Sequence, residues 1–563
     1  MINSINVFSF RRRRNLFNII TRFLFHLNNK SSIQTLIFFL FFFFSSYLKA
    51  QESFSVSIVP ITINNAPALH SFAYGTLNGK WLFIGGRTNG LHDFEPPFAF
   101  PTQYANDSIF VVDVNASQSW GVPATALPDT ILQSISSTNM EFYQNDSTLY
   151  LIGGYGYDNS VSDYRTFARL TAINLNGLIN AVITNTNINP WFRQIVDSNL
   201  AITGGNIDKI DSTYYLTFGQ RFDGRYNRSD TLGFFYQQYS RQIRKFTIYD
   251  DGVNLAINNY QTIDDTANFR RRDYNLVHQI FPNRQEGFTA FGGVFQYNAL
   301  LPYLTPIDIS PSGYNVINSF NQNLEQYSTA CMPVYDSLYN AMHTVFFGGI
   351  SLYYIDTTTN TMMMDTLVPF VNTISKVTRD SNGILTEYQL PITMPGLMGT
   401  NAEFIINPAI PSYHNKIINL DTLTGNTLVG YIVGGLTSTL PNISDQSPPP
   451  SYPSNIIYKV YIDKTITSPE KPISNSILNF IVYPNPASEF IRIEFSLKQE
   501  GRAEVSIFDN KGSLVGNVFD ESTTSGNHQL KWKPKNLASG NYFCRIKMGK
   551  ESKTQKFVFE KKQ

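Results

Sequence analysis

A short apolar run followed by glycine recurs six times between residues 51 and 463. The clearest copies are Trp81–Ile84, followed by Gly85 and Gly86, and Leu149–Ile152, followed by two further glycines. The last glycines of the six copies are Gly86, Gly154, Gly219, Gly293, Gly349 and Gly435, and the third copy lacks the first glycine of the pair. Each run is too short for a helix and rich in strand-forming residues, so the pattern predicts one buried strand in each of six similar units.

Small sheets of this kind have to shield one another. A single small sheet cannot bury its faces, whereas several sheets arranged around an axis can. We therefore expect an all-β fold in which residues 51–463 form a six-bladed β-propeller. Residues 53–61 and 456–462 both alternate as strands, so we predict that the two ends pair in one sheet and leave no exposed edge. An array of β-sandwiches, in which the glycine pairs only mark turns, is the alternative.

Further strand signals follow the glycine motifs. Examples are Asp107–Val114, which precedes Trp120, and Arg244–Tyr249. The order of turn, apolar run, glycine pair, second strand and tryptophan resembles the kelch repeat of β-propeller proteins. The glycines are spaced near 70 residues apart, against the ~50 of kelch repeats. We therefore expect long loops between the strands, and loops on one face of a propeller are where binding usually occurs.

The loops after the first three glycine motifs are rich in aromatic and polar residues. Tyrosine faces with Asn, Asp and Arg nearby suit sugar rings or protein surfaces. The predicted ligand-binding residues are Arg87, His92, Tyr155, Tyr157, Arg221, Arg225 and Tyr226. The alternative is that these side chains pack the rim of the propeller.

We predict no catalytic residue, metal site or cofactor. The six histidines after residue 50 do not occur in a metal-binding spacing, and the sequence contains neither a Gly-x-Ser-x-Gly elbow nor a phosphate-binding glycine loop. Kelch propellers include copper oxidases and a sialic-acid mutarotase, so a carbohydrate-active enzyme stays the alternative. Cys331, near Tyr327, is the thiol available to a copper site of the first kind, and its flanking residues do not support that match. The second kind would need Glu, Arg and His on one face.

Charge argues against nucleic acid as a partner. Residues 51–477 carry 22 Lys and Arg against 33 Asp and Glu. Phosphate binding needs concentrated basic residues, which an acidic surface does not offer.

Residues 1–50 have the pattern of a signal peptide. Seven basic and no acidic residues precede or flank the apolar stretch from Ile33 to Leu48, and Ala50 is a plausible cleavage position. A membrane anchor is the alternative, but about 16 apolar residues is short against the ~20 that span a bilayer. We therefore expect no transmembrane segment after signal removal.

The C-terminal part predicts a linker over residues 464–477 and a small β-sandwich over residues 478–563. Its motifs are Tyr483-Pro484-Asn485-Pro486, a turn with Gly512, and Gly540 followed by Tyr542. This order resembles the type A sorting domain of the Bacteroidetes type IX secretion system, although Cys544 stands where that family usually has an aliphatic residue. An ordinary adhesive sandwich is the alternative.

The resemblance implies recognition by the type IX translocon and a secreted or cell-surface protein on the exterior of the outer membrane. With the kelch resemblance, it predicts an exported binding protein whose propeller loops recognise a glycan or protein ligand. An adhesin-like scaffold for a partner protein is a further alternative.

Overall fold

The computed structural model describes residues 54–563 except for positions 96, 228–234, 298, 357, 360, 444–445, 466–470, 474–475, 535–536, 550 and 562–563. The predicted signal peptide lies outside the described residues. What is described is mainly β-strand, as expected. Among these residues, no helix combines the length and apolarity needed to cross a bilayer.

The first four sheets of the central part, residues 54–463, each contain four antiparallel strands. They are β2 (Ala73–Leu77), β3 (Lys80–Ile84), β4 (Ser108–Asp113) and β5 (Gln118–Pro123); β6 (Glu141–Asn145), β7 (Thr148–Ile152), β10 (Arg169–Asn174) and β11 (Phe192–Val196); β12 (Asn206–Ile210), β13 (Thr213–Thr217), β16 (Gln242–Asp250) and β17 (Leu255–Asp264); and β18 (Asn275–Ile280), β19 (Glu286–Phe291), β20 (Ile307–Ser310) and β21 (Gly313–Val316).

The fifth and sixth sheets contain the same four-stranded unit with additions. The fifth consists of β22 (Cys331–Asp336), β23 (Ala341–Ile350), β26 (Phe370–Arg379) and β27 (Leu385–Thr393), extended by β29 (Ser412–Tyr413), β30 (Ile417–Asn419) and β34 (Lys471–Ile473). The sixth consists of β28 (Leu397–Ile406), β31 (Asn426–Ser438), β33 (Ile457–Asp463) and β1 (Ser55–Ile61), with β32 (Ser451–Pro453) beside β31. Strand β34 falls within the interval that we expected to be a linker.

Short elements occupy the connections. They are the hairpin strands β8 (Tyr155–Asp158), β9 (Asp163–Thr166), β14 (Gln220–Asp223), β15 (Tyr236–Tyr239), β24 (Tyr353–Asp356) and β25 (Thr361–Met364), the helices α3 (Asp129–Ile135) and α4 (Leu175–Thr184), and the 3-10 turns Thr102–Tyr104, Asn189–Trp191, Ser198–Leu200 and Leu420–Thr422. The long loops expected from the repeat spacing are therefore partly folded into hairpins and helices.

Strand β1 pairs with β33, so the two ends of the central part lie in one sheet. The pairing is antiparallel, with Ser55 opposite Asp463 and Ile61 opposite Ile457. The prediction that residues 53–61 and 456–462 share a sheet is confirmed.

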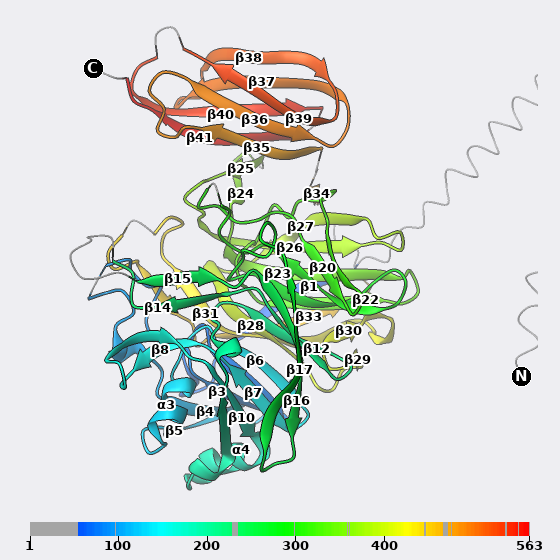
Figure 1. Cartoon of the computed structure of the whole chain (residues 1–563). Coiled ribbons are helices and arrows are strands. Elements are labelled where there is room, and N and C mark those ends of the chain that lie inside the picture. The colour runs from blue at the N-terminus through cyan, green and yellow to red at the C-terminus, as the bar shows by residue number, and fades with distance from the viewer. Residues whose placement is uncertain are drawn as a thin grey trace, which may run out of the picture. The chain divides into compact units, whose positions relative to one another are not determined.

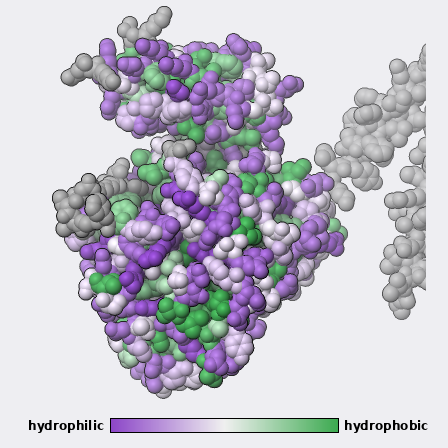
Figure 2. All heavy atoms as spheres, in the orientation of Figure 1, coloured by the Kyte–Doolittle hydropathy of each residue, from purple (hydrophilic) through white to green (hydrophobic). Residues whose placement is uncertain are grey.

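All six apolar runs form strands, as predicted, and each is the second strand of its sheet: β3, β7, β13, β19, β23 and β31. Their side chains contribute to apolar clusters that lie between consecutive sheets. One cluster joins Leu82 of the first sheet to Leu149 of the second, and similar clusters follow along the chain. Another joins the sixth sheet to the first, where the Trp81 and Tyr431 rings lie 5.0 Å apart. Each sheet therefore buries apolar surface against both neighbours, while most side chains on the face visible in Figure 2 are hydrophilic.

The glycine motif connects each second strand to the segment that enters the next sheet. Gly154 has a φ of 86°, and its N–H donates to the Ile202 carbonyl at 2.9 Å, just before the third sheet. A Cβ on Gly153 would lie 2.1 Å from the same oxygen. Equivalent bonds run from Gly86 to Ser137, Gly219 to Arg271, Gly293 to Gln326 and Gly435 to Leu69. The last of these connects the sixth sheet to the segment that enters the first.

A second series of backbone bonds joins the starts of the first strands. Asn139 N–H donates to the Ser71 carbonyl at 3.1 Å, and Gly204 N–H donates to the Asn139 carbonyl at 3.1 Å. The series continues from Asp273 to Gly204, from Ser328 to Asp273 and from Asn401 to Ser328. The first strands of the six sheets are therefore neighbours in chain order.

The tail, residues 478–563, forms a sandwich with one apolar core (orange to red in Figure 1). Its strands are β35 (Ile477–Tyr483), β36 (Ile491–Leu497), β37 (Gly501–Asp509), β38 (Leu514–Thr523), β39 (Gly526–Trp532), β40 (Gly540–Met548) and β41 (Glu551–Phe559). Strands β35, β36 and β39 form one layer, and β37, β38, β40 and β41 belong to the other.

The close approach at the glycine motif predicts a stability difference between two glycines. We expect Gly153→Ala to lower the free energy of unfolding by about 2–4 kcal/mol. The new Cβ would clash with the Ile202 carbonyl, and alanine would also have to adopt a left-handed φ. Gly252→Ala is the matched control, since Gly252 has a φ of 89° and no atom within 4 Å of its Cβ position. It should cost about 1 kcal/mol. Denaturant unfolding of both variants measures the difference, and equal losses would contradict the packing role.

Candidate functional site

A cavity of about 1420 Å³ is lined by the first strand of every sheet in the central part. The strands are β2, β6, β12, β18, β22 and β28, and representative lining residues are Tyr74, Tyr143, Asp208, His278, Cys331 and Glu403. The six sheets thus surround one space that is larger than the ~300–1,000 Å³ of common ligand pockets.

The cavity extends along the first strands to the hairpin turns that follow them. Asn206 and Ser328 line it near the strand starts, and Asp146 and Asp211 line it at the turns. The glycine motifs stand at the opposite end of each second strand. The cavity therefore extends from near the glycine-motif end, where the sequence predicted ligand binding, to the hairpin turns at the other end of the first strands.

Ionisable side chains from four parts of the chain meet on the cavity wall. His278 Nε2 lies 3.3 Å from Glu286 Oε2, and His278 Nδ1 lies 3.5 Å from Asp208 Oδ2. The other Glu286 oxygen is 2.8 Å from His414 Nε2, and Lys416 Nζ is 3.9 Å from Asp208 Oδ1. The His414 side chain is 68% exposed, so this part of the cavity is open to solvent. The result is a row in which carboxylates alternate with lysine and histidine side chains.

Burial and the two neighbouring carboxylates shift the pKa of His278 in opposite directions. Burial by itself lowers the pKa of the imidazole, but its contacts with Asp208 and Glu286 outweigh burial and raise the pKa to about 9. The side chain is 5% exposed, and its Nδ1 has no hydrogen-bond partner of good geometry among the described residues. His278 is therefore cationic at neutral pH, and each of its two ring N–H groups faces a carboxylate.

Two carboxylates on the wall have pKa values displaced in opposite directions. Burial raises the pKa of Glu403 to about 8, opposed by the charge of Lys416. Burial also disfavours ionised Asp208, but Lys416 and His278 outweigh it and lower the pKa of that carboxyl. The cavity can thus present an ionised Asp208 and a partly protonated Glu403 to the same ligand.

The described part of the chain contains no group of three or more His, Cys, Asp or Glu side chains placed to bind a metal ion. Cys331 lies on the cavity wall, and its thiol donates to the Thr329 carbonyl at 3.4 Å.

Four of the predicted loop residues lie in an aromatic cluster at the glycine-motif end. His92 stacks on the rings of Phe100 and Tyr226, at 4.4 and 5.1 Å, and those two rings lie 6.2 Å from each other. Tyr155 belongs to the same cluster, and its hydroxyl donates to the Gly224 carbonyl. The nearby Arg87 is buried and donates to the Pro101 carbonyl at 2.7 Å. Tyr226 accepts a 3.3 Å hydrogen bond from Arg272. Much of the bonding capacity of these side chains is used inside the protein.

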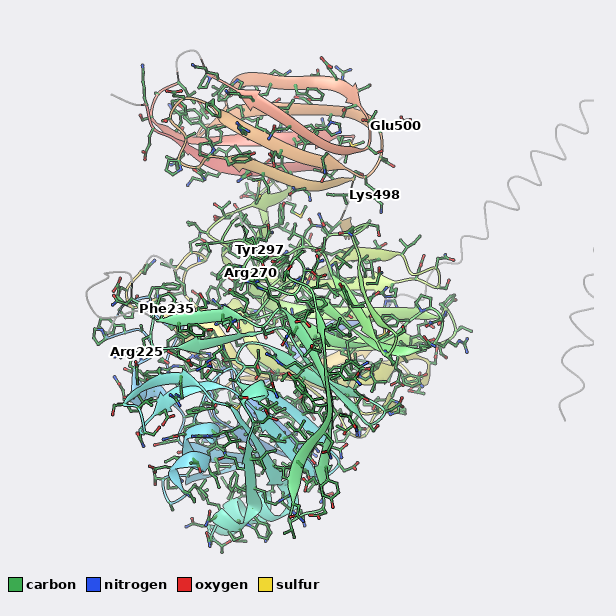
Figure 3. All side chains as sticks on the ribbon, in the orientation of Figure 1. Arg225, Phe235, Arg270, Tyr297, Lys498 and Glu500 are labelled. Atoms are coloured by element: carbon green, nitrogen blue, oxygen red, sulfur yellow. The ribbon has the colours of Figure 1, made fainter. Side chains whose placement is uncertain are left out.

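The other three predicted loop residues are more exposed. Arg221 pairs with Asp223 at 2.8 Å, Arg225 lies over the Tyr164 ring, and Tyr157 touches the edge of that ring. Arg225 and Phe235, at the ends of this loop, are labelled in Figure 3, as is a further arginine–tyrosine pair, Arg270 and Tyr297. The arginine lies 4.9 Å from that ring. This end of the central part offers exposed arginine and tyrosine side chains.

The predicted sorting residues lie at strand ends and turns of the tail. Tyr483 ends β35, and Pro484 and Pro486 follow it on either side of Asn485. Asn485 accepts a 2.8 Å hydrogen bond from Val558 N–H. Gly512 has a φ of 79° in the turn between β37 and β38. Gly540 begins β40, in which the Tyr542 hydroxyl donates to the Ala538 carbonyl at 2.9 Å.

Sequence reasoning missed the cavity residues Asp208, His278, Glu286, Glu403, His414 and Lys416. One positional signal existed: Tyr74, Tyr143 and Asp208 each stand 11 or 12 residues before the last glycine of their copy. Aligning the copies on that glycine would have placed these three side chains at equivalent positions of the first strand.

The raised pKa of His278 predicts a pH-dependent stability. The unfolded-state pKa is near 6.5 and the folded-state value about 9, so the stabilisation by charged His278 is complete below pH 6.5 and is lost as pH rises through 9. We expect the difference in unfolding free energy between the native protein and His278→Gln to shrink between pH 6.5 and 9.5. Denaturant unfolding at several pH values measures it. A difference that grows over this interval would contradict the assignment.

Comparison with known protein families identifies the tail. Residues 481–560 match the family model described as "Secretion system C-terminal sorting domain". No curated protein matches the chain. A solved structure of YjhT is 8% identical and covers 72% of this chain and 99% of its own, with a TM-score of 0.39. PorZ, a surface component of the type IX secretion system of Porphyromonas gingivalis, is 10% identical and covers 87% of this chain and 75% of its own, with a TM-score of 0.12.

Both TM-scores are too low to establish a shared fold for the central part. The match to the tail stands independently of them. The chain carries a type IX secretion sorting domain at residues 481–560, which indicates export and a secreted or cell-surface protein.

Proposed function

We propose that residues 51–463 form a six-bladed, kelch-like propeller that binds a glycan or protein ligand outside the cell after type IX export. Three observations support the propeller: six four-stranded units follow one another, apolar clusters join each unit to the next, and the sixth unit also contacts the first. The Gly435 bond to the Leu69 carbonyl agrees with the same circular order.

The observation that carries the binding role is the cavity lined by all six first strands. Ligand sites are typically concave, with apolar and aromatic walls and a few converging polar groups. Tyr74, Tyr143 and Phe404 supply the aromatic surface here, and Asp208, His278 and Glu403 supply the polar groups. Such a combination suits a sugar, which offers hydroxyls to polar side chains and a ring face to aromatic ones.

The exposed loop residues Tyr157, Arg221 and Arg225 are the second candidate surface for binding. A partner protein fits this end better than a small sugar, because its arginine and tyrosine side chains are exposed and spread over several hairpins.

A carbohydrate-active enzyme is the second candidate function. The observation that favours it is that Asp208 and Glu403 line one cavity and have pKa values displaced in opposite directions, as the two groups of an acid–base pair do. Release of reducing ends or isomerised sugar from a glycan that binds the protein would support this function.

A glycan array with the purified chain from residue 51 onward tests the binding role. We expect binding to at least one glycan and a loss of at least tenfold in affinity for Thr76→Trp, because the indole would occupy the cavity that Thr76 lines. Thr262→Trp is the matched control on the exposed outermost strand β17 of the third sheet, and it should bind normally. Equal binding by both variants would place the glycan elsewhere, and no glycan binding would favour a protein ligand.

Export provides a separate prediction. A chain that ends at Asp463 should enter the periplasm and stay there, because it lacks the matched sorting domain. Fractionation and immunoblotting of the natural host measure its location, with the full-length chain as control. Appearance of the shortened chain on the cell surface or in the medium would contradict the role of the tail.

A further inference from the structure

We propose that the cavity selects a ligand that carries a free amino group beside sugar hydroxyls, with Glu403 as the partner of the amine. This inference rests on the proposed binding role of the cavity and adds the chemical class of the ligand. The residues that carry it belong to the central part alone.

The charges on the cavity wall favour a cationic ligand. Its ionisable lining residues are Asp146, Asp208, Lys209, Asp211, His278, Glu286, Glu403, His414 and Lys416. The five carboxyl groups thus outnumber the three cationic side chains Lys209, Lys416 and His278. An anionic sugar entering this space would meet an excess of like charge, whereas an ammonium group would be attracted.

The cationic side chains already have protein partners. Lys416 lies near Asp208 and 4.7 Å from the centre of the Tyr143 ring. Lys209 donates to the Asn145 side chain at 2.7 Å and lies over the Tyr214 ring. His278 and His414 both contact Glu286. Little positive charge is therefore left to pair with the other carboxylates of the cavity lining.

Of the three other lining carboxylates, Asp146 and Asp211 are exposed, which leaves Glu403 as the one that is shielded from solvent. It lies on β28, half-buried on the cavity wall, and the described part of the chain gives its side chain neither a hydrogen bond nor an ion pair. Desolvation raises its pKa to about 8. A carboxyl in this state gains most from a ligand that brings its own positive charge, since the new ion pair replaces the lost solvation.

Aromatic groups that suit the rest of a sugar line the same cavity. The Tyr74 hydroxyl bonds the carbonyl of Phe404, the neighbour of Glu403, at 3.4 Å, which brings a phenol ring to this part of the wall. The Tyr143 ring, also on the cavity wall, adds a second aromatic surface for a sugar ring. The cavity exceeds the volume of one sugar ring, so we expect an oligosaccharide.

Two oligosaccharides with the same backbone test the inference. One is a short oligomer of β-1,4-linked glucosamine, which has free amines, and the other is the same oligomer with every amine acetylated. Isothermal titration calorimetry with the chain from residue 51 onward should show binding of the free-amine oligomer at pH 7 and at least tenfold weaker binding of the acetylated one. Raising the salt concentration should weaken the former, because an ion pair is screened.

Two variants locate the amine. Glu403→Gln should weaken binding of the free-amine oligomer at least tenfold, because the isosteric amide removes only the charge. Glu95→Gln is the matched control, since Glu95 lies in a loop and is not among the cavity-lining residues, and it should bind as the native protein does. Circular dichroism spectra of both variants should match the native spectrum.

The outcomes separate this inference from the proposed function. If both oligomers bind equally, or the acetylated one binds better, and Thr76→Trp abolishes the binding, the cavity binds sugars but the amine selectivity is wrong. If neither oligomer binds, the inference is also wrong, and the glycan array decides the proposed function on its own. Undiminished binding by Glu403→Gln would overturn the role of that residue.

Discussion

Each sheet of the central part depends on its neighbours for burial, and the rest of the structure follows from that constraint. The four-stranded units are too small to hold a core of their own, so the apolar clusters lie between consecutive sheets. The cluster around Trp81 and Tyr431 extends the same relation from the last sheet to the first. The glycine motif serves this packing, because a side chain at Gly153 would strike the carbonyl that enters the neighbouring sheet.

The apolar side chains pack between the sheets, and polar groups line the cavity. The first strands are short and face a common space, so side chains such as Asp208 and Glu403 need not be covered by another layer. Burial raises the pKa of Glu403 there, whereas the neighbouring charges lower the pKa of Asp208. This combination of partial desolvation and charge pairing is typical of ligand sites, and it arises from residues that are nearly 200 positions apart in the chain.

The repeat predicted the strands well because it records a backbone requirement. The six apolar runs, the pairing of β1 with β33, and the all-β class follow from local patterns and the need to cover sheet edges. Phe218 shows that the six copies share a backbone conformation. It stands in place of the first glycine in the third copy and still has a positive φ, of 47°. The conformation repeats even where the residue does not.

The cavity could not be predicted in the same way. His278 and Glu286 belong to one sheet, but Asp208 and Lys416 come from two other units and share no spacing with them, so the packing of the sheets brings the three parts together. The loop residues were easier to notice because aromatic and arginine side chains stand out beside glycines. Several of them, such as His92 and Arg87, are instead buried among neighbouring loops. Their part in ligand binding stays a prediction.

The pairing of Ser55–Ile61 with Ile457–Asp463 has a consequence for the order of folding. About 400 residues separate the two strands, so this contact has a very high sequence separation and forms slowly compared with the hairpins. The sixth sheet acquires its outermost strand only when both ends of the central part are in the same compartment. A chain that is still crossing a membrane leaves β1 unpaired, and the sixth sheet cannot be completed until Asp463 has emerged.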